Sequence, residues 1–248
     1  REVRSAFAEP RPGDVPAILK FDGVGEGAAG RELGDPQPYN RVEAAYARMA
    51  REAGLDVVDV RLLESEAGHA HLLIPRFDRP LSERPLHQHS LGGLLHLDYN
   101  DVGASSYEEY LRTILRLGMP PAAVLEGYRR MVFNVLAVNQ DDHVKNLSFH
   151  MDDAGRWSLT PAYDLTFAMG GQWTRAHQMR VADRRSGIRR ADLVVVGQAF
   201  GIRAPGRIVD RIGDAVAGWR AHAAETGVPA GTVEAVDRAL AARREEVG

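Results

Sequence analysis

The sequence of 248 residues contains no cysteine, which excludes disulfide bonds and thiolate metal sites and fits a protein of the reducing cytoplasm. It also lacks any apolar run near the roughly 18 residues that a membrane-spanning helix needs. No signal-peptide segment opens the chain, so we expect a cytoplasmic protein with no membrane contact. Strong charge of one sign is absent too. The net charge of −3 gives the protein no general affinity for nucleic acids or membrane surfaces.

What is present is the composition of an ordinary globular protein, with 44% hydrophobic and 26% charged residues. A chain of this length forms one large domain or two small lobes and buries a sizeable core. It begins with Arg1 rather than Met, so we expect that sequence is missing upstream.

The most informative stretch is residues 134–148, which reads NVLAVNQDDHVKNLS. An apolar helical pattern ends at Val138, and two acids, a histidine, a lysine and three amides follow within residues 139–146. Polar groups directly behind a buried helix are costly to bury without a function. Asp141 and Asn146 have the separation of the catalytic base and the metal-binding amide in the protein-kinase pattern H-R-D-x-x-x-x-N.

A further acid, Asp164, follows the segment WSLT and a predicted hairpin in PAYDL. One carboxylate to accept a hydroxyl proton, with an Asn and an Asp to hold Mg²⁺ on a triphosphate, is a set for phosphoryl transfer. The pattern therefore predicts Asp141 as the base and Asn146 and Asp164 as metal ligands. The alternative is a capped, solvated turn without a catalytic function.

These residues resemble the signature of HipA-type toxin kinases, the Ser/Thr protein kinases of bacterial toxin–antitoxin systems. The resemblance is close over residues 139–164, with NQDDHVKNLSF followed by WSLTPAYDL. It extends more loosely to residues 17–20 (AILK), residues 76–79 (RFDR) and the helix after Asn40. Most of the chain is thus covered, and the central motif is specific.

The resemblance implies an α+β, two-lobed protein-kinase-like fold. A small N-lobe with an antiparallel sheet would span residues 1–78, and a larger, mainly helical C-lobe would span residues 79–248. The catalytic loop would be residues 139–148 of the C-lobe, and the implied cofactors are ATP and Mg²⁺.

Residues of the implied nucleotide site come mostly from the N-lobe. Lys20, on a strand, would pair with the phosphates and with the helix residue Glu43, and Phe77 and Asp78 would form the hinge that touches adenine through backbone groups. Without the resemblance, Lys20 is an edge-strand lysine that faces water, Glu43 is a carboxylate near a helix N-terminus, and Phe77 is a core residue.

Two further residues of the catalytic loop receive roles by the same resemblance. Lys145, together with Lys20, would neutralise charge on the transferring phosphoryl group, because this chemistry gains mainly from positioning and electrostatics. His143 would brace the loop. The role of Asp142 is left open.

The partners are also implied by the resemblance. The substrate would be a Ser/Thr hydroxyl of a protein such as an aminoacyl-tRNA synthetase, a helix-turn-helix antitoxin would neutralise the kinase, and DNA would be reached only through that antitoxin. A basic segment is a second possible contact for an acidic partner, although a solvated loop balanced by acids elsewhere is the simpler interpretation. Its arginines are Arg180, Arg184, Arg185, Arg189 and Arg190.

The sequence departs from common kinases in two ways. Asp164 is not followed by the Gly of D-F-G, which agrees with the HipA pattern, and no Gly-rich phosphate loop is visible. The GEGAAG at residues 25–30 comes after Lys20, whereas the phosphate loop of a kinase precedes the strand lysine. A dinucleotide-binding motif would open a helix, and the prolines at 36 and 38 make a helix there unfavourable. We predict a surface loop there. The phosphate loop would lie upstream of Arg1 or within residues 6–13.

Two functions of other classes remain open. The chain would be a catalytically inactive scaffold that binds an antitoxin or DNA, or a His/Asp metal-dependent phosphohydrolase that uses residues 141–143 with Asp164. The pair His69 and His71, and the three histidines at 87, 89 and 96, have spacings that do not predict a metal site.

Patterns along the rest of the chain predict its elements. Asn40 is expected to cap a helix that ends before Gly54, and Ser106 opens a capping box for another. A helix that begins at Pro121 should lead into the catalytic loop. The remaining predictions are a strand over 17–21, a hairpin over 55–63 and 69–76, a turn over 150–156, an irregular segment over 168–190, and helices over 191–200, 205–222 and 232–244.

Overall fold

The computed structural model describes residues 3–248 apart from residues 6, 8, 10, 25–33 and 81–83. The chain mixes helices with two small antiparallel sheets of three strands each. Among the described residues, no helix is both long and apolar enough to cross a bilayer.

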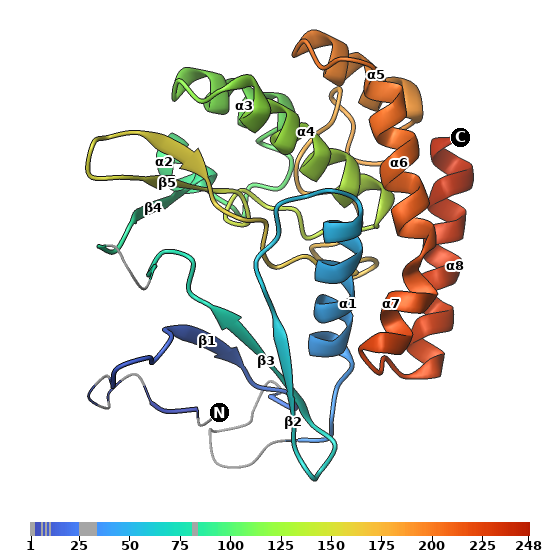
Figure 1. Cartoon of the computed structure of the whole chain (residues 1–248). Helices are drawn as coiled ribbons and strands as arrows, with labels where there is room; N and C mark the ends of the chain where they lie inside the picture. The colour runs from blue at the N-terminus through green and yellow to red at the C-terminus, as the bar shows by residue number, and fades with distance from the viewer. Residues whose placement is uncertain (1–2, 6, 8, 10, 25–33, 81–83) are drawn as a thin grey trace.

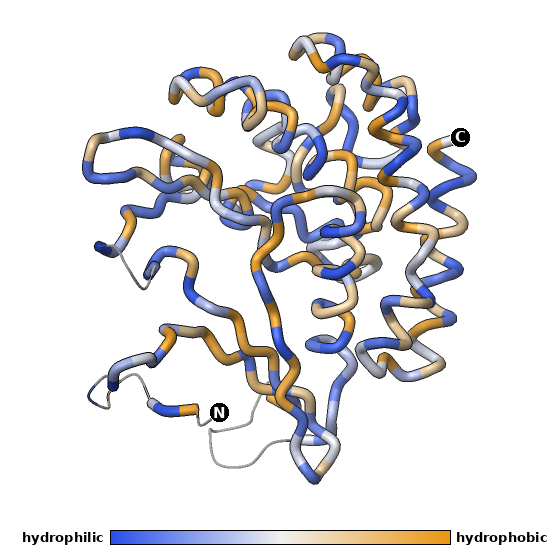
Figure 2. Tube along the Cα trace, viewed as in Figure 1, coloured by the Kyte–Doolittle hydropathy of each residue, from blue (hydrophilic) through white to orange (hydrophobic). Residues whose placement is uncertain are grey.

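The first sheet has the strand order β1-β3-β2 and lies at the bottom of Figure 1. Its strands are β1 (Ala17–Lys20), β2 (Arg61–Glu64) and β3 (Ala70–Pro75). Side chains of β3 alternate between buried and partly buried, as expected for a strand with one face on a core. Figure 2 shows the apolar character of β1 and β3.

Helix α1 (Tyr39–Glu52) joins this sheet to the rest of the molecule. Ala44 packs with Leu72 and Ile74 of β3 in a small cluster, whereas Tyr46 and Met49 belong to the main core. The same helix contacts the C-terminal helices α6 and α7. Because α1 is buried on nearly all sides, it fixes the first sheet against the helical part of the chain.

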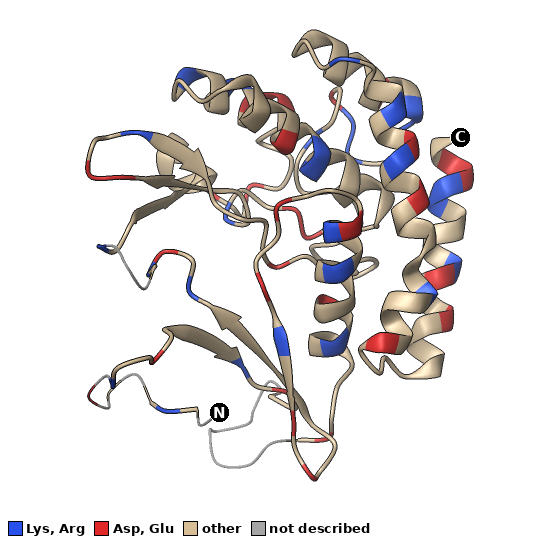
Figure 3. Ribbon diagram, viewed as in Figure 1, with Lys and Arg blue, Asp and Glu red and all other residues tan. Residues whose placement is uncertain are grey.

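The main core is built around α4 (Pro121–Leu136), in which ten residues are buried. It is surrounded by α3 (Tyr107–Arg116), α5 (Arg190–Ala199), α6 (Pro205–Ala217), α7 (Trp219–Glu225) and α8 (Ala230–Val247). Figure 3 shows that charges of both signs lie along the outer helices α6 and α8. The core therefore lies inside the helical part, with charged faces turned outward.

The second sheet, of order β4-β5-β6, includes the end of the polar loop 139–148. It consists of β4 (His87–Ser90), β5 (Ser148–Met151) and β6 (Trp157–Leu159), and the short α2 (Leu91–Leu95) follows β4 directly. Ser148 of β5 pairs with Ser90, and Phe149 pairs with Leu159. The end of the 139–148 loop is thereby held in a sheet.

Several predicted elements are confirmed. The Ser106 hydroxyl accepts a bond of 3.2 Å from the Glu109 N–H and caps α3, and Pro121 occupies the first turn of α4. The turn between β5 and β6 is present, and residues 168–189 contain only turns, bends and isolated bridges.

Two local predictions are wrong, and a third, the hairpin over 55–63 and 69–76, is confirmed as the antiparallel pair β2–β3 but with a shorter first strand. Asn40 does not cap α1, because Pro38 is the N-cap and the Asn40 amide instead donates to the carbonyls of Lys20 (3.2 Å) and Ala70 (2.9 Å). These strand carbonyls lie beside the helix start and compete successfully for the amide.

The strand predicted over 55–63 is confined to residues 61–64. Val57 instead forms an isolated bridge to Ala162. Leu55 and Val57 therefore pack in the main core and do not pair with β3. The helix predicted over 205–222 is two helices that meet at Gly218. The break turns Trp219 into the core, where its ring meets Tyr46 edge-on and its Nε1 donates to the Val233 carbonyl (3.1 Å).

Candidate active site

A tight turn at the end of α4 presents the polar loop. Val138 has a φ of +53°, a region that costs an L-residue roughly 1–2 kcal/mol. The turn is held by the Tyr46 hydroxyl, which donates to the Ala137 carbonyl (2.7 Å), and by the Ala168 N–H, which donates to Val138 (3.1 Å). Helix α4 and its packing thus form a rigid base for residues 139–148.

Lys20 brings two acids from distant parts of the chain together. Its Nζ lies 2.8 Å from both carboxylate oxygens of Glu43 on α1 and 2.5 Å from Oδ1 of Asp164. Asp164 is 144 positions away in the sequence. The predicted pairing of Lys20 with Glu43 is therefore present in the structure, and Asp164 joins it.

The electrostatics of this cluster follow from burial and pairing. Burial opposes the charge of Lys20, but the attraction of Glu43 and Asp164 outweighs it and raises the lysine pKa. For Glu43 burial dominates, and with the nearby charge of Asp164 it raises the pKa despite the opposing effect of Lys20. Two carboxylates therefore share one cation, which favours a further positive charge at Asp164.

Asn146 and Asp164 line one pocket, and Asp141 is joined to Asn146 through its backbone carbonyl. The Asn146 amide donates to the backbone carbonyl of Asp141 (3.1 Å), which closes the loop and leaves the Asn146 Oδ1 for another partner. Asn146, Tyr163 and Asp164 line the pocket. Asp164 has a φ of +57°, so its carboxylate is presented from a strained turn.

Asp142 is the buried anchor of the loop. Its side chain is 0% exposed, and its oxygens accept from the Tyr107 hydroxyl (3.0 Å), His177 Nδ1 (2.9 Å) and the Gln178 N–H (2.7 Å). A carboxylate with this many donors is not open to a metal ion. The phosphohydrolase, which needed Asp142 as a metal-site residue, is not supported by this arrangement.

The histidines do not assemble a metal site either. The described residues contain no group of three His, Cys, Asp or Glu side chains that would hold a metal ion. His69 and His71 do face the same side of β3 and stack at 6.0 Å. However, His69 is buried and bonds to the Gly34 carbonyl (2.8 Å), and His71 accepts from the Asp22 N–H (3.0 Å), so both organise the chain after β1.

Comparison with known proteins decides the family. The model of the HipA-like C-terminal domain matches residues 6–222. The chain belongs to this family.

Two proteins named as kinases are similar to this chain in sequence. The chain is 31% identical over 134 residues to a protein of Haemophilus influenzae named "Putative kinase", covering 49% of this chain and 39% of that protein. It is also 31% identical over 143 residues to "Putative kinase Y4dM" of Sinorhizobium fredii, covering 52% of this chain and 35% of that protein. The chain thus spans well under half the length of these relatives.

A solved structure shares the fold. This is HipA of Shewanella oneidensis in a toxin–antitoxin complex with HipB and operator DNA, with a TM-score of 0.71 and 20% identity. The match covers 92% of this chain and 57% of the Shewanella chain. The fold of this structure is therefore shared by nearly the whole chain.

Lys145 of this HipA-family chain lies over an aromatic ring. It is exposed, and its Nζ lies 3.2 Å from the centroid of the Tyr99 ring, a cation–π contact. His143 meets the same ring edge-on at 6.1 Å, and its buried Nδ1 has no hydrogen-bond partner among the described residues. The structure brings Lys145 and His143 together around Tyr99, a residue that the sequence did not single out.

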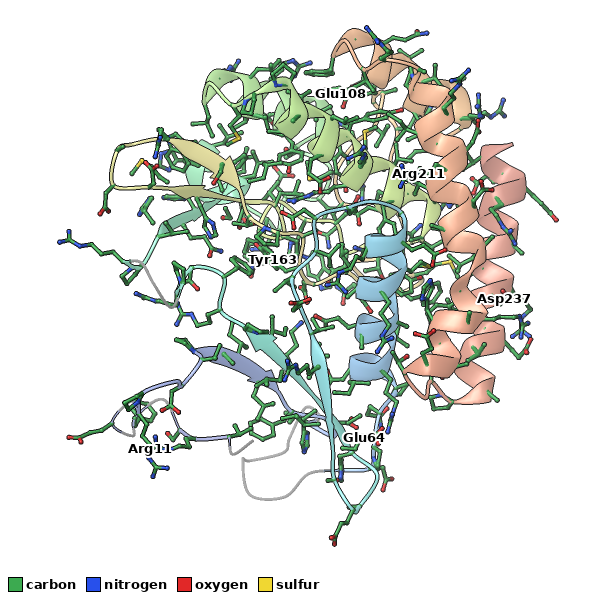
Figure 4. The ribbon with its side chains drawn as sticks, in the orientation of Figure 1. Arg11, Glu64, Glu108, Tyr163, Arg211 and Asp237 are labelled. Atoms are coloured by element: carbon green, nitrogen blue, oxygen red, sulfur yellow. The ribbon has the colours of Figure 1, made fainter. Side chains whose placement is uncertain are left out.

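The predicted hinge is well ordered by its neighbours. Arg76 holds the Asp78 carboxylate through two bonds (2.9 and 2.5 Å), which lowers the Asp78 pKa, and the Asp78 carbonyl accepts from the Leu86 N–H (3.0 Å). The Phe77 ring lies 5.6 Å from that of Tyr163. Figure 4 shows Tyr163 at the junction between the first sheet and the helical part.

Sequence reasoning missed Tyr163 and Gln178. The Tyr163 hydroxyl lies 2.6 Å from the Ser148 hydroxyl and donates to the Lys145 carbonyl (2.6 Å), so it ties Asp164 to the end of the loop. The Gln178 side chain donates to Asp141 Oδ1 (2.7 Å). Tyr163 lies inside PAYDL, which was a usable signal, whereas Gln178 lies in an irregular segment with no pattern.

Two of the five arginines of the basic segment pair with acids of the chain. Arg190 pairs with Asp210 (2.8 Å) and Arg184 lies 3.6 Å from Asp192. Arg185 donates to the His177 carbonyl (2.7 Å). For Arg184 and Arg190 the contacts agree with the simpler interpretation, in which acids elsewhere balance the arginines.

Two predictions fall wholly or partly outside the described residues. The GEGAAG at 25–30 lies outside them, and so do residues 6, 8 and 10 of the segment considered for the phosphate loop.

Proposed function

We propose that this protein is an ATP- and Mg²⁺-dependent kinase that phosphorylates a Ser or Thr hydroxyl of a protein. The observation that carries the proposal is the cluster of Lys20, Glu43 and Asp164 beside the loop that holds Asp141 and Asn146. A strand lysine, a helix glutamate, a base and two oxygen ligands are the parts that kinases use. The names of the relatives support the same chemistry.

The donor set fits Mg²⁺. Asp164 offers a carboxylate and Asn146 a free amide oxygen, and Mg²⁺ prefers a few oxygen ligands completed by waters and substrate phosphates. The excess of carboxylate over cation around Lys20 favours a divalent ion at Asp164. When bound, Mg²⁺ would supply charge neutralisation between the phosphates of ATP.

The side chains then have distinct roles. Asp141 accepts the proton of the substrate hydroxyl as this oxygen attacks the γ-phosphorus and the bond to ADP breaks. Lys20, oriented by Glu43, would contact the phosphates, and Asp164 would hold the metal ion. Lys145 leaves the Tyr99 ring to neutralise the transferring group, and His143 braces the loop around it.

The nucleotide would lie between two lobes. We assign residues 1–78 to an N-lobe and residues 79–248 to a C-lobe, with Phe77 and Asp78 as the hinge that contacts adenine through backbone groups. The Asp78 carbonyl keeps a second lone pair after its bond to Leu86. Helix α1 lies within residues 1–78 and would therefore belong to the N-lobe. Its buried side chains pack both in the small cluster with β3 and in the main core.

The proposed partners come from the similarity to HipA. The Shewanella HipA structure contains HipB and operator DNA. We infer an antitoxin with a helix-turn-helix for this chain, with DNA reached only through it, and a cytoplasmic protein substrate such as an aminoacyl-tRNA synthetase.

Transfer of labelled γ-phosphate from ATP tests the proposal. With Mg²⁺ and a cell lysate, the wild type should label a protein, and Asp141→Asn should lower the rate by roughly 10²–10⁴-fold because the general base is lost. The matched control is Asp214→Asn, an exposed acid on α6. ATP binding without transfer by the wild type would indicate the inactive scaffold, and no ATP binding would exclude the kinase.

A further inference from the structure

Gln178 makes a contact that none of the assigned roles uses. Its side-chain Nε2 donates to Asp141 Oδ1 at 2.7 Å, from 37 positions further along the chain. No hydrogen bond from the described residues reaches Asp141 Oδ2. One carboxylate oxygen is therefore held by the protein, while the other remains for a hydroxyl.

The backbone of Gln178 is fixed on both sides. Its N–H donates to Asp142 Oδ1 (2.7 Å), and its carbonyl accepts from the Gly103 N–H (2.8 Å). The residue is only 7% exposed. With both main-chain groups bonded, the side chain extends toward Asp141 from a rigid support.

Residues next to Gln178 in the sequence are also fixed by hydrogen bonds. The His177 side chain is 0% exposed and donates through Nδ1 to Asp142, and the His177 carbonyl accepts from Arg185 (2.7 Å). Arg180 forms a parallel bridge with Ser106 at the start of α3. The capped helix start thus braces the segment that contacts the catalytic loop.

We propose that Gln178 is a positioning residue for the phosphoryl transfer, and this inference rests on the proposed kinase function. Its amide fixes the rotation of the Asp141 carboxylate so that Oδ2 faces the incoming hydroxyl. A carboxylate free to rotate spends part of its time misaligned, and small misplacements of reacting groups cost large factors in rate. A positioning residue of this kind affects kcat and leaves nucleotide binding alone.

The test compares two replacements of similar length. Gln178→Met keeps the volume and loses the donor, and should lower kcat by roughly 10–100-fold with the KM for ATP unchanged. Gln178→Lys keeps a donor and should recover activity to within about 10-fold of the wild type. Both variants retain the main-chain bonds to Asp142 and Gly103, so their unfolding midpoints should stay close to that of the wild type. Gln198→Met, an exposed residue on α5, is the control.

A crystal structure of Gln178→Met gives a readout that does not depend on activity. We expect the Asp141 carboxylate to rotate or to lose its single orientation. An unchanged kcat, equal losses in the Met and Lys variants, or an unmoved carboxylate would overturn the inference. Absence of transfer by the wild type would instead contradict the kinase function, and the crystal structure would still decide the contact.

Discussion

At the level of single residues, the site depends on a buried chain of polar groups. The Asn139 amide donates to Asn134 (3.0 Å), the Asn134 amide donates to the Tyr107 hydroxyl (2.8 Å), and that hydroxyl donates to Asp142. Burial, together with the charge of Asp142, raises the Tyr107 pKa well above its usual value. These groups are buried and bonded to one another, so each member is expensive to remove.

Asp142→Ala should lower the free energy of unfolding by about 3 kcal/mol, because the Gln178 N–H and the His177 ring lose a buried partner. Urea unfolding followed by circular dichroism measures the change. Asp153→Ala, at an exposed turn position between β5 and β6, should change it by no more than about 0.5 kcal/mol. Equal stability of the two variants would show that Asp142 does not anchor the loop.

At the level of elements, close packing explains a glycine inside α5. A Cβ at Gly197 would lie 2.5 Å from Cβ of Pro205 at the start of α6 and about 3 Å from the Tyr128 ring of α4. Glycine therefore allows three helices to approach each other. Helix propensity alone favours alanine at such a site by about 1 kcal/mol, so the contact must outweigh propensity.

Gly197→Ala should destabilise the protein by roughly 1–3 kcal/mol through overpacking. Gly231→Ala, in α8, meets no atom within 4 Å and should be neutral or stabilising by up to about 1 kcal/mol. Thermal melts of both variants measure the difference. A stabilised Gly197→Ala would mean that α5 moves away from Pro205 without cost.

At the level of the whole molecule, Lys20 and α1 connect the first sheet to the helical part. Lys20 lies on β1, Glu43 on α1, and Asp164 follows the second sheet, so their ion pairs cross between the two regions. A ligand that binds Asp164 alters the ion pair between Lys20 and Asp164. Its binding is therefore coupled to the stability of the folded chain.

Mg²⁺ and ATP together should raise the melting temperature of the wild type more than ATP with EDTA does. A ligand at 100 times its Kd adds about 2.7 kcal/mol to the free energy of unfolding. Asp164→Asn should lose the Mg²⁺-dependent part of the shift, and Asp237→Asn on α8 should keep it. Equal shifts with and without Mg²⁺ would contradict the metal ligands proposed here.

The sequence by itself determined the features that depend on local patterns. The spacing of Asp141 and Asn146, the cap at Ser106 and the run of apolar residues in α4 are encoded within a few neighbouring positions. The resemblance of 139–164 to HipA-type kinases was enough to predict the family that the comparison then confirmed. Short-range propensities and motif spacing carry this information directly.

Only the tertiary structure decided which distant side chains meet. Asn40 bonds to two strands instead of capping α1, Lys145 lies on Tyr99, Asp142 is an anchor, and Gln178 reaches Asp141. Each contact joins segments that are far apart in the chain. Their energies depend on which partners the packed core brings within bonding distance, and no local pattern specifies that.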